Sequence, residues 1–230
     1  MLFAVITGLS LACWQIGRAH QKEAIEARLL VREHSPAVPL PVAADMAAME
    51  YERVSLTGEF VTGWPLYLDN RPMNGAAGFY VLMPFKLQGQ NKAVLIMRGW
   101  LARNAVSRTV IREYRTPAGV THSEGLLRAN SGHTMQLGKN PPLVPGVIIQ
   151  NLDMNELVRV SHLPLVSFVV EQSRDLSGSS DGLLREWPRA STGADRHRGY
   201  AFQWLALAVM ALLFFIVTGF KSAGKSNETR

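Results

Sequence analysis

Two long apolar stretches, one at each end of the chain, dominate the pattern of hydrophobic and polar positions. The C-terminal stretch carries no charge from Gly199 to Phe220, and Arg198 and Lys221 bracket it. A helix of this length measures roughly 33 Å, which is enough to cross a hydrocarbon core of about 30 Å. Residues 1–17 form a shorter candidate at the lower limit for a span. The sequence therefore predicts transmembrane helices at 1–17 and 199–220, followed by a tail at 221–230.

The first apolar stretch has two other interpretations. A cleaved signal peptide would carry a basic lead and an A-x-A cleavage site, and residues 1–17 show neither clearly. A lipoprotein site at Cys13 would need an apolar residue three positions earlier, where Ser10 stands. We therefore expect an uncleaved anchor. Because no polar lead precedes the apolar run, we also expect the natural start to lie further upstream.

Small residues recur along one face of each predicted span. In the first they lie four positions apart, and in the second they share one side of the helix. The residues are Ala4, Gly8 and Ala12 in the first span and Ala201, Ala208 and Ala211 in the second. Small side chains let helix backbones approach closely in lipid. We therefore expect the two spans to pack together.

The segment between the spans, residues 18–198, is long enough to bury a core of its own. Residues 18–34 are charged and helical in pattern, which predicts a stem continuous with the first span. After a proline-rich break, residues 51–175 show short β-branched and aromatic stretches separated by turn residues. Strands are predicted within 51–61, 64–70, 78–87, 93–102, 122–130 and 164–173, and a helix within 153–162 with Asp153 as its N-cap.

The predicted fold class is thus an α+β membrane protein, in which N- and C-terminal transmembrane helices flank a β-rich soluble domain. The soluble domain is expected to be a small barrel or curved sheet.

Composition narrows the possible chemistry. The single cysteine forbids an internal disulfide, and there is no Cys-x-x-Cys, His-x-His or methionine cluster for a dedicated copper or zinc site. The formal charge of +6 comes from scattered basic residues without an aromatic–basic strip. We therefore expect no nucleic-acid partner.

One hydrolase motif matches by letter. Residues 178–182 read G-x-S-x-G, with Asp195 and His197 downstream in the order of a catalytic triad. That mechanism requires a strand running into Ser180 and a helix leaving it. The predicted strand ends several residues earlier, and Pro188 cuts short the segment after the motif. We expect no enzymatic activity and expect Ser180 to be dispensable.

A histidine stands at the mouth of the second span. On a helix, His197, Tyr200 and Trp204 share a face with the small residues of that span, and Arg196 and Arg198 flank the histidine. Neutral imidazole is a good iron ligand, and arginines could pair with propionates, so this face could hold a haem. The alternative is an interfacial aromatic belt with snorkelling arginines. The residues alone favour the belt.

Four sequence blocks resemble the Surfeit-locus cytochrome oxidase assembly family. The first is Trp14, Gln15, Arg18 and Lys22; the second is "DNRPMNGAAGFYVLMPF" at 69–85; the third is Arg98, Gly99 and Trp100; the fourth is His197, Tyr200, Ala201 and Trp204. They lie in the family's order and cover nearly the whole chain. The sequence departs from the family pattern at Met97 and at 77–79, and lacks a tryptophan expected within 149–153.

The resemblance implies a chaperone without turnover. Such a protein would hold haem a, with His197 as axial ligand and Arg196, Tyr200, Trp204 and Arg198 around it. It would pass the haem to the catalytic subunit of a haem–copper oxidase, and its other partners would be the haem a synthesis machinery and membrane lipid. A membrane-anchored scaffold for respiratory-complex assembly, without haem, remains the alternative. We interpret Trp100 as a core aromatic and leave the roles of Asn70, Arg71 and Arg98 open.

Charge and resemblance disagree about topology. Basic residues near the membrane ends flank the large domain more heavily than the tail, which by itself would place that domain inside. The family places it outside. The charge rule is weak for long domains, so we follow the resemblance. The prediction is a multi-pass protein of a bacterial inner membrane, with residues 18–198 in the periplasm and both termini cytoplasmic.

Overall fold

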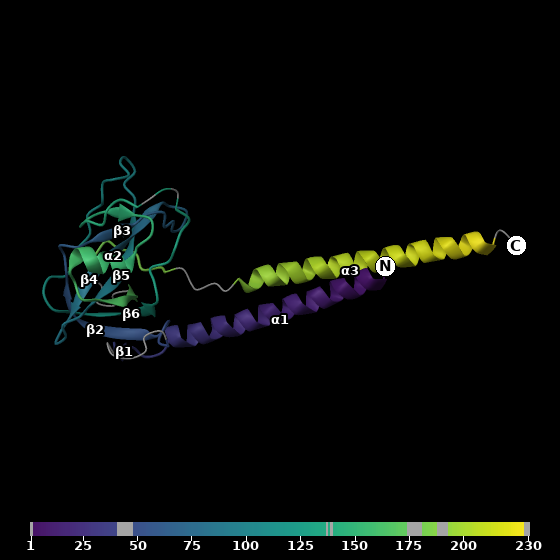
Figure 1. Ribbon diagram of the computed structural model, residues 1–230, viewed down its shortest axis with the longest axis horizontal. Coiled ribbons are helices and arrows are strands. Elements are labelled where there is room, and N and C mark those ends of the chain that lie inside the picture. The colour runs from purple at the N-terminus through teal and green to yellow at the C-terminus, as the bar shows by residue number, and fades with distance from the viewer. Residues whose placement is uncertain are drawn as a thin grey trace. The chain divides into compact units, whose positions relative to one another are not determined.

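The computed structural model describes residues 2–40, 48–136, 138, 140–173, 181–187 and 193–227, shown in Figure 1. The chain divides into two compact units. One consists of Met1–Val31 with Arg189–Arg230, and the other of Arg32–Pro188. We describe each unit by itself.

The first unit is a pair of long helices. Helix α1 spans Leu2–Glu33 and α3 spans Ala194–Asn227, and the two run side by side in opposite directions (Figure 1). Helix α1 runs without a break through the segment predicted as a helical stem, as far as Glu33. Among the described residues, α3 is the one helix with a stretch long and apolar enough to cross a membrane, over Ala194–Thr218. A span at 1–17 therefore stays a prediction.

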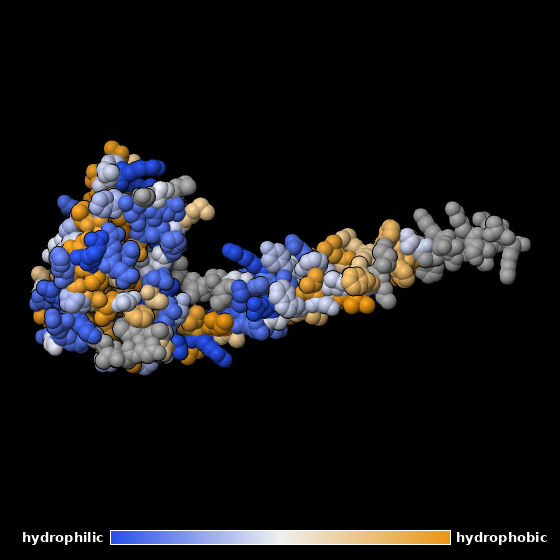
Figure 2. All heavy atoms as spheres, viewed as in Figure 1, coloured by the Kyte–Doolittle hydropathy of each residue, from blue (hydrophilic) through white to orange (hydrophobic). Residues whose placement is uncertain are grey.

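The exposed surface of α3 is apolar over much of its length. Exposed large hydrophobic side chains run from Leu205 to Val217. Figure 2 shows hydrophobic side chains gathered along the helix pair, beyond a hydrophilic end. Because contacts within the protein leave most of these side chains exposed, lipid is the solvent that suits this surface.

The predicted packing of small residues is confirmed in part. Gly8, Ala12, Ala201 and Ala208 are buried between the helices. A Cβ atom added at Gly8 would lie 2.9 Å from the Cβ of Ala208, so the two backbones meet closely there. Ala4, however, is exposed. The buried positions of α1 alternate in steps of four and three, as in a coiled coil, so a strict spacing of four leaves the contact face.

The second unit is β-rich. Its strands are β1 (Val38–Pro39), β2 (Arg53–Phe60), β3 (Leu66–Leu68), β4 (Gly78–Leu87), β5 (Ala93–Ala102), β6 (Thr121–Arg128), β7 (Ile148–Ile149) and β8 (Leu165–Gln172). Six of them match the predicted strands closely. The short strands β1 and β7 were not predicted, because two residues carry no periodicity.

Five of these strands close into a small barrel. Neighbours pair in the order β2–β6–β8–β5–β4, and β4 pairs back onto β2 through Phe85 and Phe60. All pairs in this ring are antiparallel except β5–β8. The barrel option of the predicted fold class is therefore confirmed for this domain.

Alternating side chains divide the core into an interior and an outer layer. The interior cluster draws buried residues from all five barrel strands; they include Leu56, Phe85, Ile96, Leu127 and Val170. The outer cluster lies on the opposite faces of β4, β5 and β8 and includes residues of helix α2 (Met154–Ser161) and of strand β3, which pairs with β4. Since strand residues alternate between faces, β4 and β5 are buried on both sides and read as continuous apolar runs.

Two local predictions in this unit are confirmed. Asp153 caps α2 by accepting hydrogen bonds from the backbone N–H groups of Asn155 and Glu156. Trp100 is buried in the outer cluster, and its Nε1 donates to the carbonyl of Arg71 at 2.6 Å. The indole packs where Gly78 has no side chain, since a Cβ there would lie 2.3 Å from the Trp100 ring.

Candidate functional site

The helix pair brings His197 into contact with the first helix. Its Nδ1 lies 2.6 Å from Oε1 of Gln15, a residue 182 positions away in the sequence. Gln15 is only 9% exposed and occupies the same seam as Gly8, Ala12 and Ala19. An amide oxygen accepts hydrogen bonds, so the geometry assigns the ring proton to Nδ1. The other ring nitrogen, Nε2, makes no hydrogen bond with any described residue and keeps its lone pair.

The seam itself has a coiled-coil spacing on both helices. Its more buried positions on α3 recur in alternating steps of three and four residues; they are Ala194, His197, Ala201, Trp204, Ala208 and Ala211. Such spacing keeps one face toward the partner helix along its length. His197 and Trp204 therefore stand on the contact face, and α1 covers much of the face that the sequence suggested as an open slot.

The remaining predicted site residues lie around this seam in different settings. Tyr200 is 51% exposed and points off the contact face. Arg198 is bound to Glu23 on α1 at 2.6 Å and lies 3.8 Å from Asp195. Arg196 is exposed, and its side chain forms no ion pair with a described residue. Of the two predicted propionate partners, Arg196 is thus the cation that remains available.

The triad order suggested by the G-x-S-x-G match, which we expected to be fortuitous, is not supported by the contacts of Asp195 and His197. Ser180 lies outside the described residues, together with Gly178 and Ser179. Asp195 is 97% exposed at its side chain and its contact is with Arg198, whereas His197 bonds to Gln15. A triad needs the acid hydrogen-bonded to the imidazole, so these two residues lack the required link.

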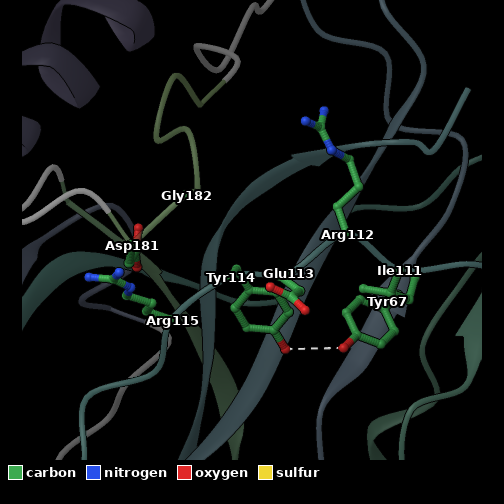
Figure 3. Close-up of a pocket in the computed structure, with 8 residues that line it drawn as sticks. All are labelled: Tyr67, Ile111, Arg112, Glu113, Tyr114, Arg115, Asp181 and Gly182. Atoms are coloured by element: carbon green, nitrogen blue, oxygen red, sulfur yellow. Dashed lines mark hydrogen bonds between the residues drawn. The ribbon is translucent and has the colours of Figure 1, made fainter.

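A second candidate lies in the barrel unit, where a pocket of about 710 Å³ opens beside Tyr67 and Tyr114. Figure 3 shows the two phenol groups pointing at one another, joined by a hydrogen bond of 3.1 Å. Burial raises the pKa of Tyr114, and its bond to Tyr67 acts in the same direction. The Tyr114 hydroxyl is therefore neutral at physiological pH.

Beneath this pocket lies a buried ion cluster centred on Arg98. Its guanidinium donates to Asp181 at 2.9 Å, to the carbonyl of Arg115 at 2.9 Å and to Thr116 Oγ1 at 2.6 Å. It also lies over the ring of Phe60 at 4.7 Å. Burial lowers the pKa of Arg98, and the charge of Asp181 opposes that shift.

The carboxylate of Asp181 serves two cations. It binds Arg98 and Arg185, whose side chains are almost fully buried, and its Oδ1 accepts the backbone N–H of Leu183. Leu184 then pairs with Trp100 through two backbone hydrogen bonds, of 2.6 and 2.9 Å. This network fastens residues 181–187 across the barrel. Asp181, in the described part of the G-x-S-x-G match, therefore has a structural role. We call its contacts with Arg98, Arg185 and Leu183 the clamp.

The two other residues left open by the sequence also hold the fold. Arg71 donates to the carbonyl groups of Asp69, Gly132 and Gln150, tying three segments together, and lies over the Tyr80 ring at 5.7 Å. Asn70 has a positive φ of 59°, a conformation that asparagine tolerates better than most residues.

The metal chemistry of the described residues is limited. They hold no group of three or more His, Cys, Asp or Glu side chains that could bind a metal ion together. Nε2 of His197 offers a single nitrogen, which would suit only a metal already held by a macrocycle. The residue that sequence reasoning underrated is Gln15, which appeared only as a letter of a family block. No signal along the chain links it to His197.

Comparison with known sequences shows which protein family this chain matches. Residues 2–209 match the sequence model of the SURF1 family. The chain belongs to the SURF1 family. This confirms the resemblance inferred from the sequence blocks, and the match covers α1, the barrel and the first part of α3.

Individual relatives agree with this assignment. A SURF1-like protein of Rickettsia felis is 26% identical over 218 residues, covering 91% of this chain and 90% of that protein. A SURF1-like protein of Rickettsia bellii is 27% identical over 238 residues, covering the whole chain and 93% of that protein. The cytochrome oxidase assembly protein SHY1 of Saccharomyces cerevisiae is 31% identical over 111 residues, which cover 46% of this chain and 28% of SHY1.

Proposed function

We propose that this protein is an assembly factor for cytochrome c oxidase or a related haem–copper oxidase. It binds haem a at the helix pair, with His197 as axial ligand, and aids insertion of the haem into the catalytic subunit. Its partners are that subunit, the haem a synthesis machinery and membrane lipid. It carries no catalytic turnover of its own.

The assembly role rests on family membership. The yeast SHY1 relative bears the name of a cytochrome oxidase assembly protein, and the family match runs through nearly the whole of this chain. The second unit also fits a structural rather than a catalytic role. Its buried arginines, Arg98 and Arg71, and the half-buried Asp181 are engaged in contacts that hold the fold.

The haem-binding role rests on one observation, the environment of His197. The imidazole donates from Nδ1 to Gln15 and keeps Nε2 free, which is the tautomer that a haem-ligating histidine needs. Arg196 is exposed nearby and could pair with a propionate, whereas Arg198 would first have to exchange Glu23. When bound, haem would contribute an iron centre that takes a neutral imidazole nitrogen as a ligand. The chain's own part is to supply the ligand and the apolar surface.

The proposed location rests on the apolar surface of α3 and the antiparallel helices. We propose a bacterial inner membrane, with α1 and α3 both spanning it, residues 18–198 periplasmic and the segment at 221–230 cytoplasmic. Reporter fusions test this arrangement. A phosphatase fused at Gly132 should be active and one fused at Arg230 silent, and the reverse pattern would overturn it.

Haem copurification tests the function against its alternative. The full chain, extracted in mild detergent from cells that make haem a, should carry haem with defined Soret and α bands. The same preparation should retain the oxidase catalytic subunit. A membrane scaffold would retain the subunit without haem. A haem-free protein recovered from haem a-producing cells would contradict haem binding and leave the scaffold role.

A further inference from the structure

We propose that Gln15 is a positioning residue for His197. Its side-chain oxygen holds the imidazole in the Nδ1–H tautomer and fixes the ring plane, so that Nε2 is presented as the metal-facing nitrogen. The tautomer assignment depends only on the contact between Gln15 and His197 within the helix pair. Its consequence for haem rests on the proposed function.

The contact has the properties expected of a positioning hydrogen bond. It is short, at 2.6 Å, and it joins two different helices. Gln15 is 9% exposed, so little water competes for the amide oxygen. A free neutral imidazole can place its single proton on either nitrogen, and a fixed acceptor facing Nδ1 selects one of the two. The acceptor therefore leaves Nε2 with the lone pair that ligation requires.

The seam explains why the contact is held in register. Gly8 and Ala208 meet closely on the same face, where an added Cβ would lie 2.9 Å from that of Ala208. The ion pair of Arg198 with Glu23 joins the same two helices near His197. With the helices fixed by both contacts, neither Gln15 nor His197 can swing away without breaking the pair. On this view α1 is part of the binding site as well as an anchor.

The tautomer can be measured without any haem. Protein labelled with ¹⁵N-histidine, held in detergent well above the ordinary histidine pKa of about 6.5, should show His197 with a protonated Nδ1 and an unprotonated Nε2. Gln15→Leu removes the acceptor at similar volume, so the ring proton should redistribute toward Nε2. Gln21→Leu makes the same chemical change at an exposed position of α1 and should leave the His197 signals unchanged. An identical tautomer in wild type and Gln15→Leu would overturn the inference.

The consequence for ligation is tested with hemin. Gln15→Leu should weaken hemin binding roughly tenfold, the lower end of the effect seen when a histidine ligand loses its hydrogen-bond acceptor. In the reduced complex the iron–histidine stretching band should fall in frequency, and Gln15→Glu should raise it, because a carboxylate accepts more strongly. A purely structural role for Gln15 would change stability and leave this band unmoved in both variants, which would refute positioning.

A parallel titration of His197→Ala separates the two levels of the proposal. If His197→Ala loses hemin and Gln15→Leu does not differ from wild type, positioning is refuted and the proposed function stands. If His197→Ala binds hemin as well as wild type, the proposed haem site is refuted together with the metal-facing part of this inference. The tautomer result is then judged on the nuclear magnetic resonance measurement alone.

Discussion

The ion cluster under the barrel pocket allows a quantitative test of how residues 181–187 are held. Asp181→Asn keeps the shape of the side chain and removes the charge that Arg98 and Arg185 share. The side chain of Arg98 is 1% exposed, so its charge cannot regain water without opening the barrel. Removing one partner of a buried pair costs about 3–5 kcal/mol. Arg98 keeps its bonds to Thr116 and to the carbonyl of Arg115, so we expect about 3 kcal/mol, the lower end of that range.

Replacing the other partner of this ion pair should lower the free energy of unfolding by less. Arg98→Met removes the buried charge itself, and Asp181 keeps both Arg185 and the backbone N–H of Leu183. What is lost is the ion pair with Asp181, two further hydrogen bonds and ring contact, but no buried charge is left without a partner, so the expected cost is about 2 kcal/mol. Arg159→Met, at a side chain that is 74% exposed, serves as the matched control and should stay within about 0.5 kcal/mol.

Urea unfolding of the full chain in mild detergent, monitored by near-ultraviolet circular dichroism, measures these differences. With a slope near 2 kcal/mol per molar, the midpoint for Asp181→Asn should fall by about 1.5 M. If Arg98→Met proved more damaging than Asp181→Asn, an unpaired Arg98 charge would not be the dominant cost. A midpoint for Asp181→Asn equal to that of Arg159→Met would refute the clamp altogether.

Two further predictions concern the helix pair and the barrel. Gly8→Leu should separate α1 from α3, because an added Cβ would lie 2.9 Å from that of Ala208; Gly17→Leu should not, because nothing lies within 4 Å of a Cβ added there. Disulfide cross-linking between cysteines introduced on the two helices compares the two variants. Equal cross-linking yields would contradict the packing. Burial raises the pKa of Glu171 above 4.5, although Arg128 opposes the shift. A raised carboxyl pKa contributes stability that is full below the unfolded value and lost as the pH rises through the folded value. The unfolding free energy of wild type minus that of Glu171→Gln should therefore increase as the pH falls from 7 toward 4.5, and a difference that shrinks on acidification would show that the ion pair outweighs desolvation.

Local signals explain which parts of the fold could be predicted. The strands β4 and β5 carry long apolar runs between turn residues, and the Asp153 cap precedes a short amphipathic helix, so each is recognisable within about ten residues. The seam of the helix pair was predictable in kind because small residues mark close helix contacts. Its exact face was not, since Ala4 and Gly8 look alike until the partner helix is placed.

The contacts that define the two sites join residues far apart in the sequence. Gln15 and His197 are 182 positions apart, and Arg98 and Asp181 are 83 apart. In a single sequence neither pair leaves a periodic or spacing signal. The role of Asp181 left no such signal either. Its motif resembled a nucleophile turn, whereas its carboxylate forms ion pairs with buried arginines. Tertiary structure alone distinguishes those two interpretations.

The central claim, that His197 presents a ligand nitrogen for haem, is tested most directly by a hemin titration of His197→Ala beside His20→Ala. His20 is exposed on α1, so its replacement removes an imidazole from the same helix pair without touching the seam. We predict that His197→Ala inserts at wild-type levels and loses or strongly shifts the Soret and α bands. His20→Ala should bind hemin as wild type does. Unchanged spectra and affinity in His197→Ala would contradict the claim and leave His197 as a residue of the interfacial aromatic belt.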